Sequence, residues 1–173
     1  VLDLLEARIA SASTPVVLPT ITLKRFGLVD AFEAFLKASG LAYATTPMDK
    51  SLLSEEHPAF LGMYNGHRSS PPGLGSVVEQ ADLLLDLGGL VLEDLNTGLW
   101  SGSLDQTRIV SIHADWVQAG DQVFTSVSIS DVLEGLTKRF EAASQCLNSW
   151  GERRPARPDS LLPVAGTPDQ PTD

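Results

Sequence analysis

Glycines, acids and small polar residues that could surround a phosphate are concentrated in the stretch "LGGLVLEDLNTG", residues 87–98. In nucleotide-binding folds, a loop of this kind at the end of a strand receives the phosphate groups. Here Glu93 and Asp94 would repel a phosphate, and the stretch contains no arginine to offer it charge-assisted hydrogen bonds. Three interpretations stay open: a capped turn in which Asn96 and Thr97 bond the local backbone, a surface that faces a neighbouring domain, and a nucleotide site.

Two neighbouring features also point to binding surfaces. Trp100 stands in a loop of glycines and serines, a setting typical of an aromatic side chain that packs against a partner. Lys24 and Arg25, in "LKRFG", lie between the first predicted strand and its helix, where the crevice of an open α/β sheet forms. A solvated pair flanking a helix and a site for an effector carboxylate near Arg25 are both compatible with these residues.

Signatures of catalytic and metal sites are missing from the sequence. His57, His67 and His113 are far apart and have no metal-ligand spacing with a cysteine or a second histidine. The chain has no G-x-S-x-G elbow, no P-loop and no G-x-G-x-x-G, and "PTITLKRFG" stands where a dinucleotide fold places its glycines. We therefore assign no catalytic, cofactor-binding or metal-binding residue to this chain.

Charge and composition exclude several classes of partner. Twelve basic and 22 acidic residues give a net charge of −10, which repels nucleic acid and anionic lipid, and no apolar run approaches the roughly 20 residues of a membrane span. A single cysteine, Cys146, excludes an internal disulfide and favours a reducing, cytoplasmic setting. The chain begins at Val1 without an initiator methionine, so we expect it to be part of a longer protein.

The elements that must position these residues follow from hydrophobic periodicity. Helices are predicted over 1–12 and 27–40, from a cap at Ser70, and from a cap at Ser130. Strands are predicted over 14–20, 41–46, 82–89, 107–115 and within 121–129. Alternating strands and helices predict an α/β, Rossmann-like three-layer domain over residues 1–150, with a five- or six-stranded mainly parallel sheet. The proline-rich residues 151–173 are predicted to form a disordered linker or tail.

Three blocks of the sequence resemble a known family. They are "ATTPMDKSLLSEEHPAFLGMYNG" (44–66), "VEQADLLLDLGGLVLEDLNTG" (78–98) and "IVSIHADWVQAGDQVFTSV" (109–127). In this order they resemble the central domain of thiamine-diphosphate-dependent 2-oxo acid decarboxylases, the pyruvate, indolepyruvate and phenylpyruvate decarboxylase group, over roughly residues 10–140. The resemblance implies a six-stranded Rossmann-like unit between a pyrimidine-binding domain and a diphosphate-binding domain.

The same resemblance implies what this chain does not supply. In the family, a glutamate of the first domain activates the cofactor, and a G-D-G…N motif of the third holds the diphosphate and Mg²⁺; neither motif occurs here. The implied role is a catalytically inert central domain of a homodimeric or homotetrameric parent, which binds thiamine diphosphate and Mg²⁺ elsewhere. The candidate interdomain or effector contacts are Arg25, Asp94, Asn96, Thr97 and Trp100.

Two alternatives remain at this point. Some relatives hold FAD on the central domain through glycines after the first strand and an R-F-D-D-R-V-T-G segment after a later one. This chain matches Asp94, Thr97 and Gly98 of that segment but has none of its arginines. The alternatives are an FAD- or ADP-binding central domain of a related oxidase, synthase or CoA-decarboxylase, and a stand-alone α/β interaction domain.

Overall fold

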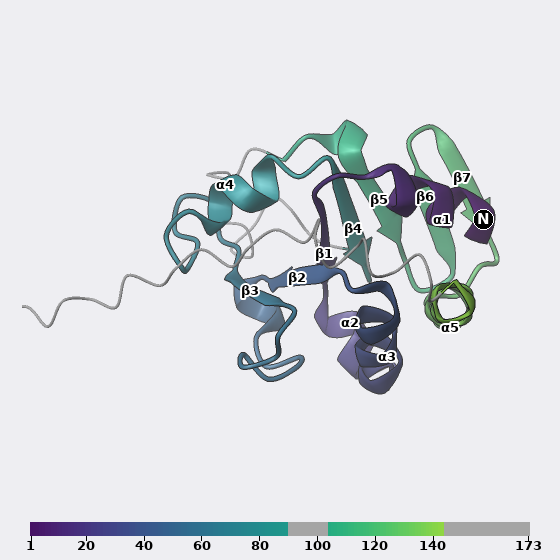
Figure 1. Ribbon diagram of the computed structural model, residues 1–173, viewed down its shortest axis with the longest axis horizontal. Coiled ribbons are helices and arrows are strands. Elements are labelled where there is room, and N and C mark those ends of the chain that lie inside the picture. The colour runs from purple at the N-terminus through teal and green to yellow at the C-terminus, as the bar shows by residue number, and fades with distance from the viewer. Residues whose placement is uncertain (90–103, 144–173) are drawn as a thin grey trace, which may run out of the picture.

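The computed structural model describes residues 1–89 and 104–143, which form one α/β unit (Figure 1). Their sheet has seven strands in the order β3-β2-β1-β4-β5-β6-β7. The strands are β1 (Pro15–Pro19), β2 (Ala42–Thr45), β3 (Phe60–Met63), β4 (Leu83–Leu87), β5 (Ile109–Ile112), β6 (Trp116–Ala119) and β7 (Gln122–Thr125). The first five strands in this spatial order are parallel to one another, and β6 and β7 extend the sheet as an antiparallel hairpin. The predicted Rossmann-like class is confirmed, with seven strands where five or six were expected.

Helices cover both faces of the sheet, but unequally. The larger core lies on one face, under α1 (Leu2–Ser11), α2 (Ile21–Arg25), α3 (Val29–Ser39) and α5 (Ile129–Ala142). The smaller core lies on the opposite face, under α4 (Leu74–Glu79). Strand β1 serves both, because Val17 joins the larger core while Val16 and Leu18 join the smaller one. Burial on both faces explains why this strand has no polar alternation in its sequence.

The first and last described helices pack closely against each other. A Cβ on Gly135 of α5 would lie 2.5 Å from Leu2 Cδ1, so the missing side chain is what lets α1 approach. Arg139 of α5 then donates to Asp3 at 2.6 Å and to Glu6 at 2.7 Å. These contacts hold the N-terminal helix on the same face as α5.

Among the α-helices and strands that the structure describes, three were not predicted from the sequence: α2, β3 and β6. Helix α2 is only five residues long, too short for a hydrophobic repeat to show. Strand β3 contains Gly62 at φ +138 within a turn-rich stretch, and it forms because its backbone pairs with β2. The strand predicted over 107–115 ends at Ile112, and a tight turn, in which the N–H of His113 donates to the carbonyl of Trp116 at 2.8 Å, leads into β6 beyond the predicted range.

Two predicted helix caps were wrong. Helix α5 is capped by Ser128, not Ser130, because the Ser128 hydroxyl accepts the N–H of Asp131 at 3.0 Å. Helix α4 begins after Gly73, whose left-handed φ of +90 fits glycine, and not at Ser70. Ser70 instead exchanges backbone hydrogen bonds with Met63 at the end of β3. Both errors concern boundaries, and the two helices themselves are present.

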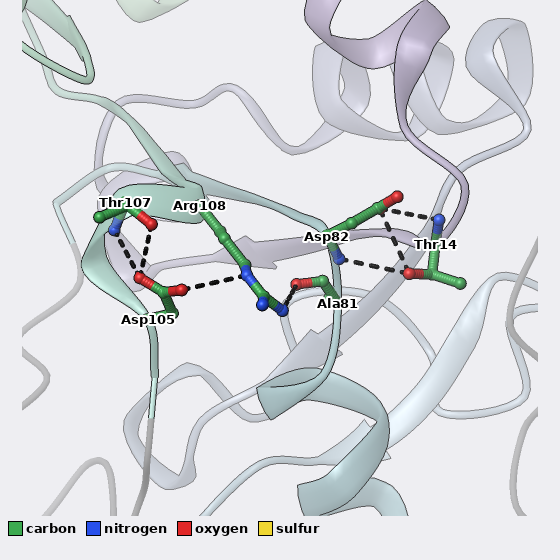
Figure 2. A network of polar contacts seen from close by, with 6 residues as sticks. All are labelled: Thr14, Ala81, Asp82, Asp105, Thr107 and Arg108. Atoms are coloured by element: carbon green, nitrogen blue, oxygen red, sulfur yellow. Dashed lines mark hydrogen bonds and ion pairs between the residues drawn. The ribbon is translucent and has the colours of Figure 1, made fainter.

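At the amino edge of the sheet, a polar network fastens the starts of β1, β4 and β5 (Figure 2). The carboxylate of Asp82 accepts the backbone N–H groups of Ser13 at 2.6 Å and Thr14 at 2.8 Å. Partial burial raises the pKa of Asp82, but its hydrogen bonds lower the pKa by more, so that the net shift is downward. Arg108 pairs with Asp105 at 3.1 Å and donates to the carbonyl of Ala81 at 3.4 Å. The starts of the three strands are thereby joined to one another.

Candidate functional site at the carboxyl edge

The strand order reverses between β1 and β4, and this switch point is where an open parallel sheet usually binds its ligand. From β1 the chain continues to β2 and β3 on one side, whereas β4 continues to β5 on the other. The carboxyl ends of β1 and β4 therefore lie side by side at the point where the strand order reverses. We take the residues that follow these two strands, together with their neighbours after β2 and β5, as the candidate site.

Two threonines fill the space between the segments that leave β1 and β4. The N–H of Thr20 donates to the carbonyl of Leu87 at 2.9 Å, and Thr22 Oγ1 donates to the carbonyl of Gly88 at 3.1 Å. Gly88 has a φ of +116, and a Cβ there would collide with Thr20 Oγ1 and lie 2.8 Å from Thr22 Cβ. The protein's own side chains thus occupy the position where a dinucleotide fold needs bare glycine backbone.

A buried carboxylate holds the start of α2. Asp49, at the end of the short 3₁₀ helix η1 (Pro47–Asp49), is 3% exposed, and its Oδ1 accepts the N–H of Ile21 at 2.6 Å. The hydroxyl of Thr46 donates to the other carboxylate oxygen. Burial raises the pKa of Asp49, against the opposing effect of its hydrogen bonds with Thr46 and Ile21. Asp49 therefore positions a helix terminus, with both of its oxygens engaged.

On the other side of the switch point, the end of β4 meets an aromatic pair that follows β5. The rings of His113 and Trp116 stack at 3.6 Å between centroids with 12° between their planes. A Cβ on Gly89, at φ +82, would lie 2.7 Å from His113 Nδ1, so the glycine lets the imidazole reach the strand exit. Burial lowers the pKa of His113, and the nearby Asp115 opposes this shift. The imidazole of His113 therefore gives up its proton at a lower pH than a free histidine does.

One of the predicted contact residues can be placed. Arg25 lies in the last turn of α2 and is exposed, and within residues 1–89 and 104–143 its side chain has no ion pair or hydrogen bond. The other four, Asp94, Asn96, Thr97 and Trp100, lie outside the described residues, as does the predicted tail over 151–173. The structure neither brings Arg25 together with them nor separates it from them.

Sequence reasoning missed two parts of this site. Thr46 and Asp49 stand in "TPMD", which fits the capping pattern of a threonine followed three residues later by an acid. That pattern could have indicated a turn at this position, although not that it holds Ile21. The stacking of His113 on Trp116 depends on the turn between β5 and β6, and no local sequence pattern indicates it.

The described side chains suit packing and positioning. In residues 1–89 and 104–143, no three or more of the residue types His, Cys, Asp and Glu gather into a group that could hold a metal ion. Within the same residues, no helix has the length and apolar character needed to cross a bilayer. His57, the histidine nearest the carboxyl end of β2 in sequence, uses Nδ1 to accept the N–H of Ala59 at 3.1 Å.

Comparisons with known proteins agree with this architecture. A family model described as "Thiamine pyrophosphate enzyme, central domain" matches residues 2–138. Pyruvate decarboxylase of Hanseniaspora uvarum is 34% identical over 142 residues, covering 82% of this chain and 25% of the relative. Pyruvate decarboxylase isozyme 1 of Saccharomyces cerevisiae is 32% identical over 145 residues, covering 84% of this chain and 25% of the relative. Alpha-keto-acid decarboxylase of Mycobacterium leprae is 34% identical over 120 residues, covering 69% and 21%. The chain thus spans about a quarter of the length of these curated relatives.

Proposed function

Because this chain belongs to the family of thiamine pyrophosphate enzyme central domains, we propose that it is the non-catalytic central domain of a 2-oxo acid decarboxylase. The parent converts a 2-oxo acid and a proton to an aldehyde and CO₂. The observation that carries this proposal is the family match over residues 2–138, which includes every described strand. The names of the relatives, pyruvate decarboxylase and alpha-keto-acid decarboxylase, support the 2-oxo acid as the substrate class.

The residues at the switch point of this chain do not fit the diphosphate of the cofactor. Thr20 and Thr22 occupy the space beside Gly88, and the N–H of Ile21 at the start of α2 is already engaged by Asp49. We therefore place the binding of thiamine diphosphate and Mg²⁺ in the other domains of the parent. In the parent, the cofactor supplies the carbanion chemistry that removes the carboxylate.

We propose that this chain serves as a structural domain that contacts the other domains of the parent, and that these contacts also take part in regulation. We propose that Arg25, Asp94, Asn96, Thr97 and Trp100 contact the pyrimidine-binding and diphosphate-binding domains or an effector carboxylate. A homodimeric or homotetrameric assembly and a cytoplasmic location belong to the same proposal. Arg25 supports it because it is exposed and has no partner among the described residues.

The test compares the decarboxylase activity of the full-length parent with that of this chain. We expect the full-length parent, with thiamine diphosphate and Mg²⁺, to release CO₂ from pyruvate, phenylpyruvate or indolepyruvate. The 173-residue chain under the same conditions should give no turnover above a cofactor-only control. A parent without decarboxylase activity would refute the proposed reaction, and turnover by the short chain would refute its non-catalytic role.

A calorimetric titration with FAD and ADP tests the nucleotide-binding alternative. The threonines beside Gly88 leave a pyrophosphate no close approach to the backbone, so we expect no binding at micromolar ligand. The double variant T20G/T22G serves as a comparison, because it removes the two side chains but adds no arginine. Micromolar affinity in the unmodified chain would move it to the flavin or ADP branch of the family.

A further inference from the structure

The two outer strands of the sheet, β3 and β7, differ in how their free edges are covered. At β3, Met63 exchanges two backbone hydrogen bonds with Ser70, at 2.7 and 2.9 Å. A Cβ on Gly62 would lie 2.5 Å from Pro71 Cδ, so the chain after β3 packs directly along this strand. At the other end of the sheet (Figure 1), no described strand lies beyond β7. The edge at β3 is thus covered by the chain itself, whereas the edge at β7 is open among the described residues.

The hydrogen-bond pattern of the last three strands shows which backbone groups of β7 point outward. The N–H of His113 donates to the carbonyl of the first residue of β6, so that residue faces β5 and the next one, Val117, faces β7. Val117 pairs with Phe124, which therefore faces β6. Because the direction alternates along an antiparallel strand, the N–H and C=O groups of Val123 and Thr125 point away from the sheet.

The side chains of β7 do not guard this edge. Proteins usually protect an edge strand with a charged residue, a proline or a bulge. Strand β7 contains neither a charged residue nor a proline, and it pairs with β6 over four consecutive residues without a shift in register. Its Val123 is 56% exposed. The uncharged stretch continues from Gln122 to Ser130, in a chain whose net charge is −10, so this edge is where another strand can approach with little repulsion.

We propose that β7 pairs antiparallel with β7 of a second copy of this chain, about a two-fold axis at Phe124, so that the two sheets become one continuous sheet. In this register Val123 lies opposite Thr125 of the second copy, and Thr125 lies opposite its Val123. All the outward groups of both strands are then paired, in four hydrogen bonds that the two-fold axis relates. This pairing is independent of the reaction proposed for the parent.

The side chains of this register favour a second copy as the occupant. Phe124 lies opposite Phe124 of the second copy, and aromatic pairs of this kind stabilise neighbouring strands. Asp121 is the charged residue nearest to β7, and the antiparallel arrangement places the two copies of Asp121 at opposite ends of the paired strands. Two acidic chains thereby meet without like charges directly opposite each other.

Amide hydrogen exchange in the full-length parent tests the pairing, because hydrogen-bonded amides exchange slowly and exposed ones exchange quickly. We expect the N–H groups of Val123 and Thr125 to exchange at least about tenfold more slowly than unprotected amides. The N–H of Phe124, which faces β6, is the internal reference for a folded strand. Unprotected exchange at Val123 and Thr125, with Phe124 protected, would overturn the proposal.

Cysteine substitutions in the parent test the occupant and the register. Phe124→Cys places two cysteines directly opposite each other in a non-hydrogen-bonded pair, at about 4.5 Å between Cα atoms, which suits a disulfide. Val123→Cys is the matched control. Val123 is the more exposed of the two residues, but in this register its two copies lie about 7–8 Å apart on the diagonal, which is too far for a disulfide.

Oxidised glutathione should therefore link Phe124→Cys between copies at least about tenfold faster than Val123→Cys, as measured by mapping the linked peptides. Protected amides without this cross-link would show that a different segment covers β7, and would overturn the proposed occupant. Preferential linkage through Val123→Cys would overturn the register and the two-fold axis with it.

A proline at position 123 tests the hydrogen bonds themselves. Val123→Pro removes one outward N–H but no hydrogen bond to β6, and a proline is tolerated at such a position of an edge strand. We expect this variant to expose the N–H of Thr125 to exchange, whereas Val123→Thr, which keeps the N–H, should retain the protection. The N–H of Phe124 shows in each variant whether β7 is folded. Protection of Thr125 that persists in Val123→Pro would refute the pairing.

Discussion

Asp49 Oδ1 accepts the backbone N–H of Ile21 at 2.6 Å, so the segment after β2 holds the start of α2 from 28 positions away in the sequence. The carboxylate is 3% exposed and also receives the hydroxyl of Thr46. This hydrogen bond therefore fixes the position of η1 relative to the start of α2.

Two substitutions of Asp49 should distinguish the contribution of its hydrogen bonds to stability from that of its charge. We expect Asp49→Ala to lower the free energy of unfolding by about 2 kcal/mol, because the N–H of Ile21 loses its partner. Asp49→Asn retains an acceptor for Ile21 and should cost far less at neutral pH. Urea denaturation of the three proteins measures both effects, and equal losses in the two variants would contradict this assignment.

The pH dependence of the same pair has a definite sign. Burial raises the pKa of Asp49 above 3.8, so the folded state holds this proton more tightly than the unfolded state does. Its contribution to stability is present below pH 3.8 and is lost as the pH rises through the folded pKa. The stability of Asp49→Asn relative to the unmodified protein should therefore increase across that window. A constant difference would show that the pKa of Asp49 is not raised.

Gly88 should tolerate alanine far less well than Gly27 does. Both glycines have positive φ, +116 and +68, but a Cβ on Gly88 meets Thr20 and Thr22, whereas a Cβ on Gly27 has no atom within 4 Å. We expect Gly88→Ala to cost about 3 kcal/mol or more, and Gly27→Ala, which carries only the backbone penalty, about 1 kcal/mol. Thermal unfolding compares the two variants. Similar midpoints would mean that the space beside Gly88 is open.

Protonation of His113 should quench the fluorescence of Trp116, because a positively charged imidazole stacked on an excited indole accepts an electron from it. Replacing Trp100 and Trp150 by phenylalanine leaves Trp116 as the only one of the three tryptophans. Burial lowers the pKa of His113, so we expect emission to fall with a midpoint below pH 6.5, the ordinary value. His113→Gln in the same background should remove the transition, and a transition that persists would assign it to another group.

The free energy of unfolding should also depend on the protonation of His113. The depressed pKa of His113 means that the unfolded state binds the proton more tightly, so its contribution is fully present above pH 6.5. That contribution is lost as the pH falls from 6.5 through the folded pKa. Urea midpoints of the unmodified protein and His113→Gln should accordingly converge or cross as the pH is lowered. Parallel curves over this range would exclude a linkage through His113.

Deletion of residues 151–173 should leave the thermal midpoint of the chain nearly unchanged. Five of these 23 residues are proline and the segment has no hydrophobic period, so it has little apolar surface with which to offset the entropy of ordering. Differential scanning calorimetry of the chain ending at Trp150 measures the effect. A fall of more than a few degrees would show that these residues dock on the domain.

Local sequence patterns determined the class of the fold. The apolar run that forms β4 is buried along its whole length, as expected of a central parallel strand, and Gly40 ends α3 at a left-handed φ of +66. The three sequence blocks indicated the family that the comparisons show. These features could be predicted because hydrophobic periodicity, a glycine at the end of a helix and sequence motifs are properties of neighbouring residues.

Only the tertiary structure decided which residues meet at the candidate site. Thr22 bonds Gly88 across 66 positions, and Asp49 reaches Ile21 across 28. Strands β3 and β6 likewise depend on pairing with β2 and β5, since four residues have little strand preference of their own. Contacts of this kind arise when the sheet brings distant backbone segments to one edge, and local propensity contains no information about which segments those will be.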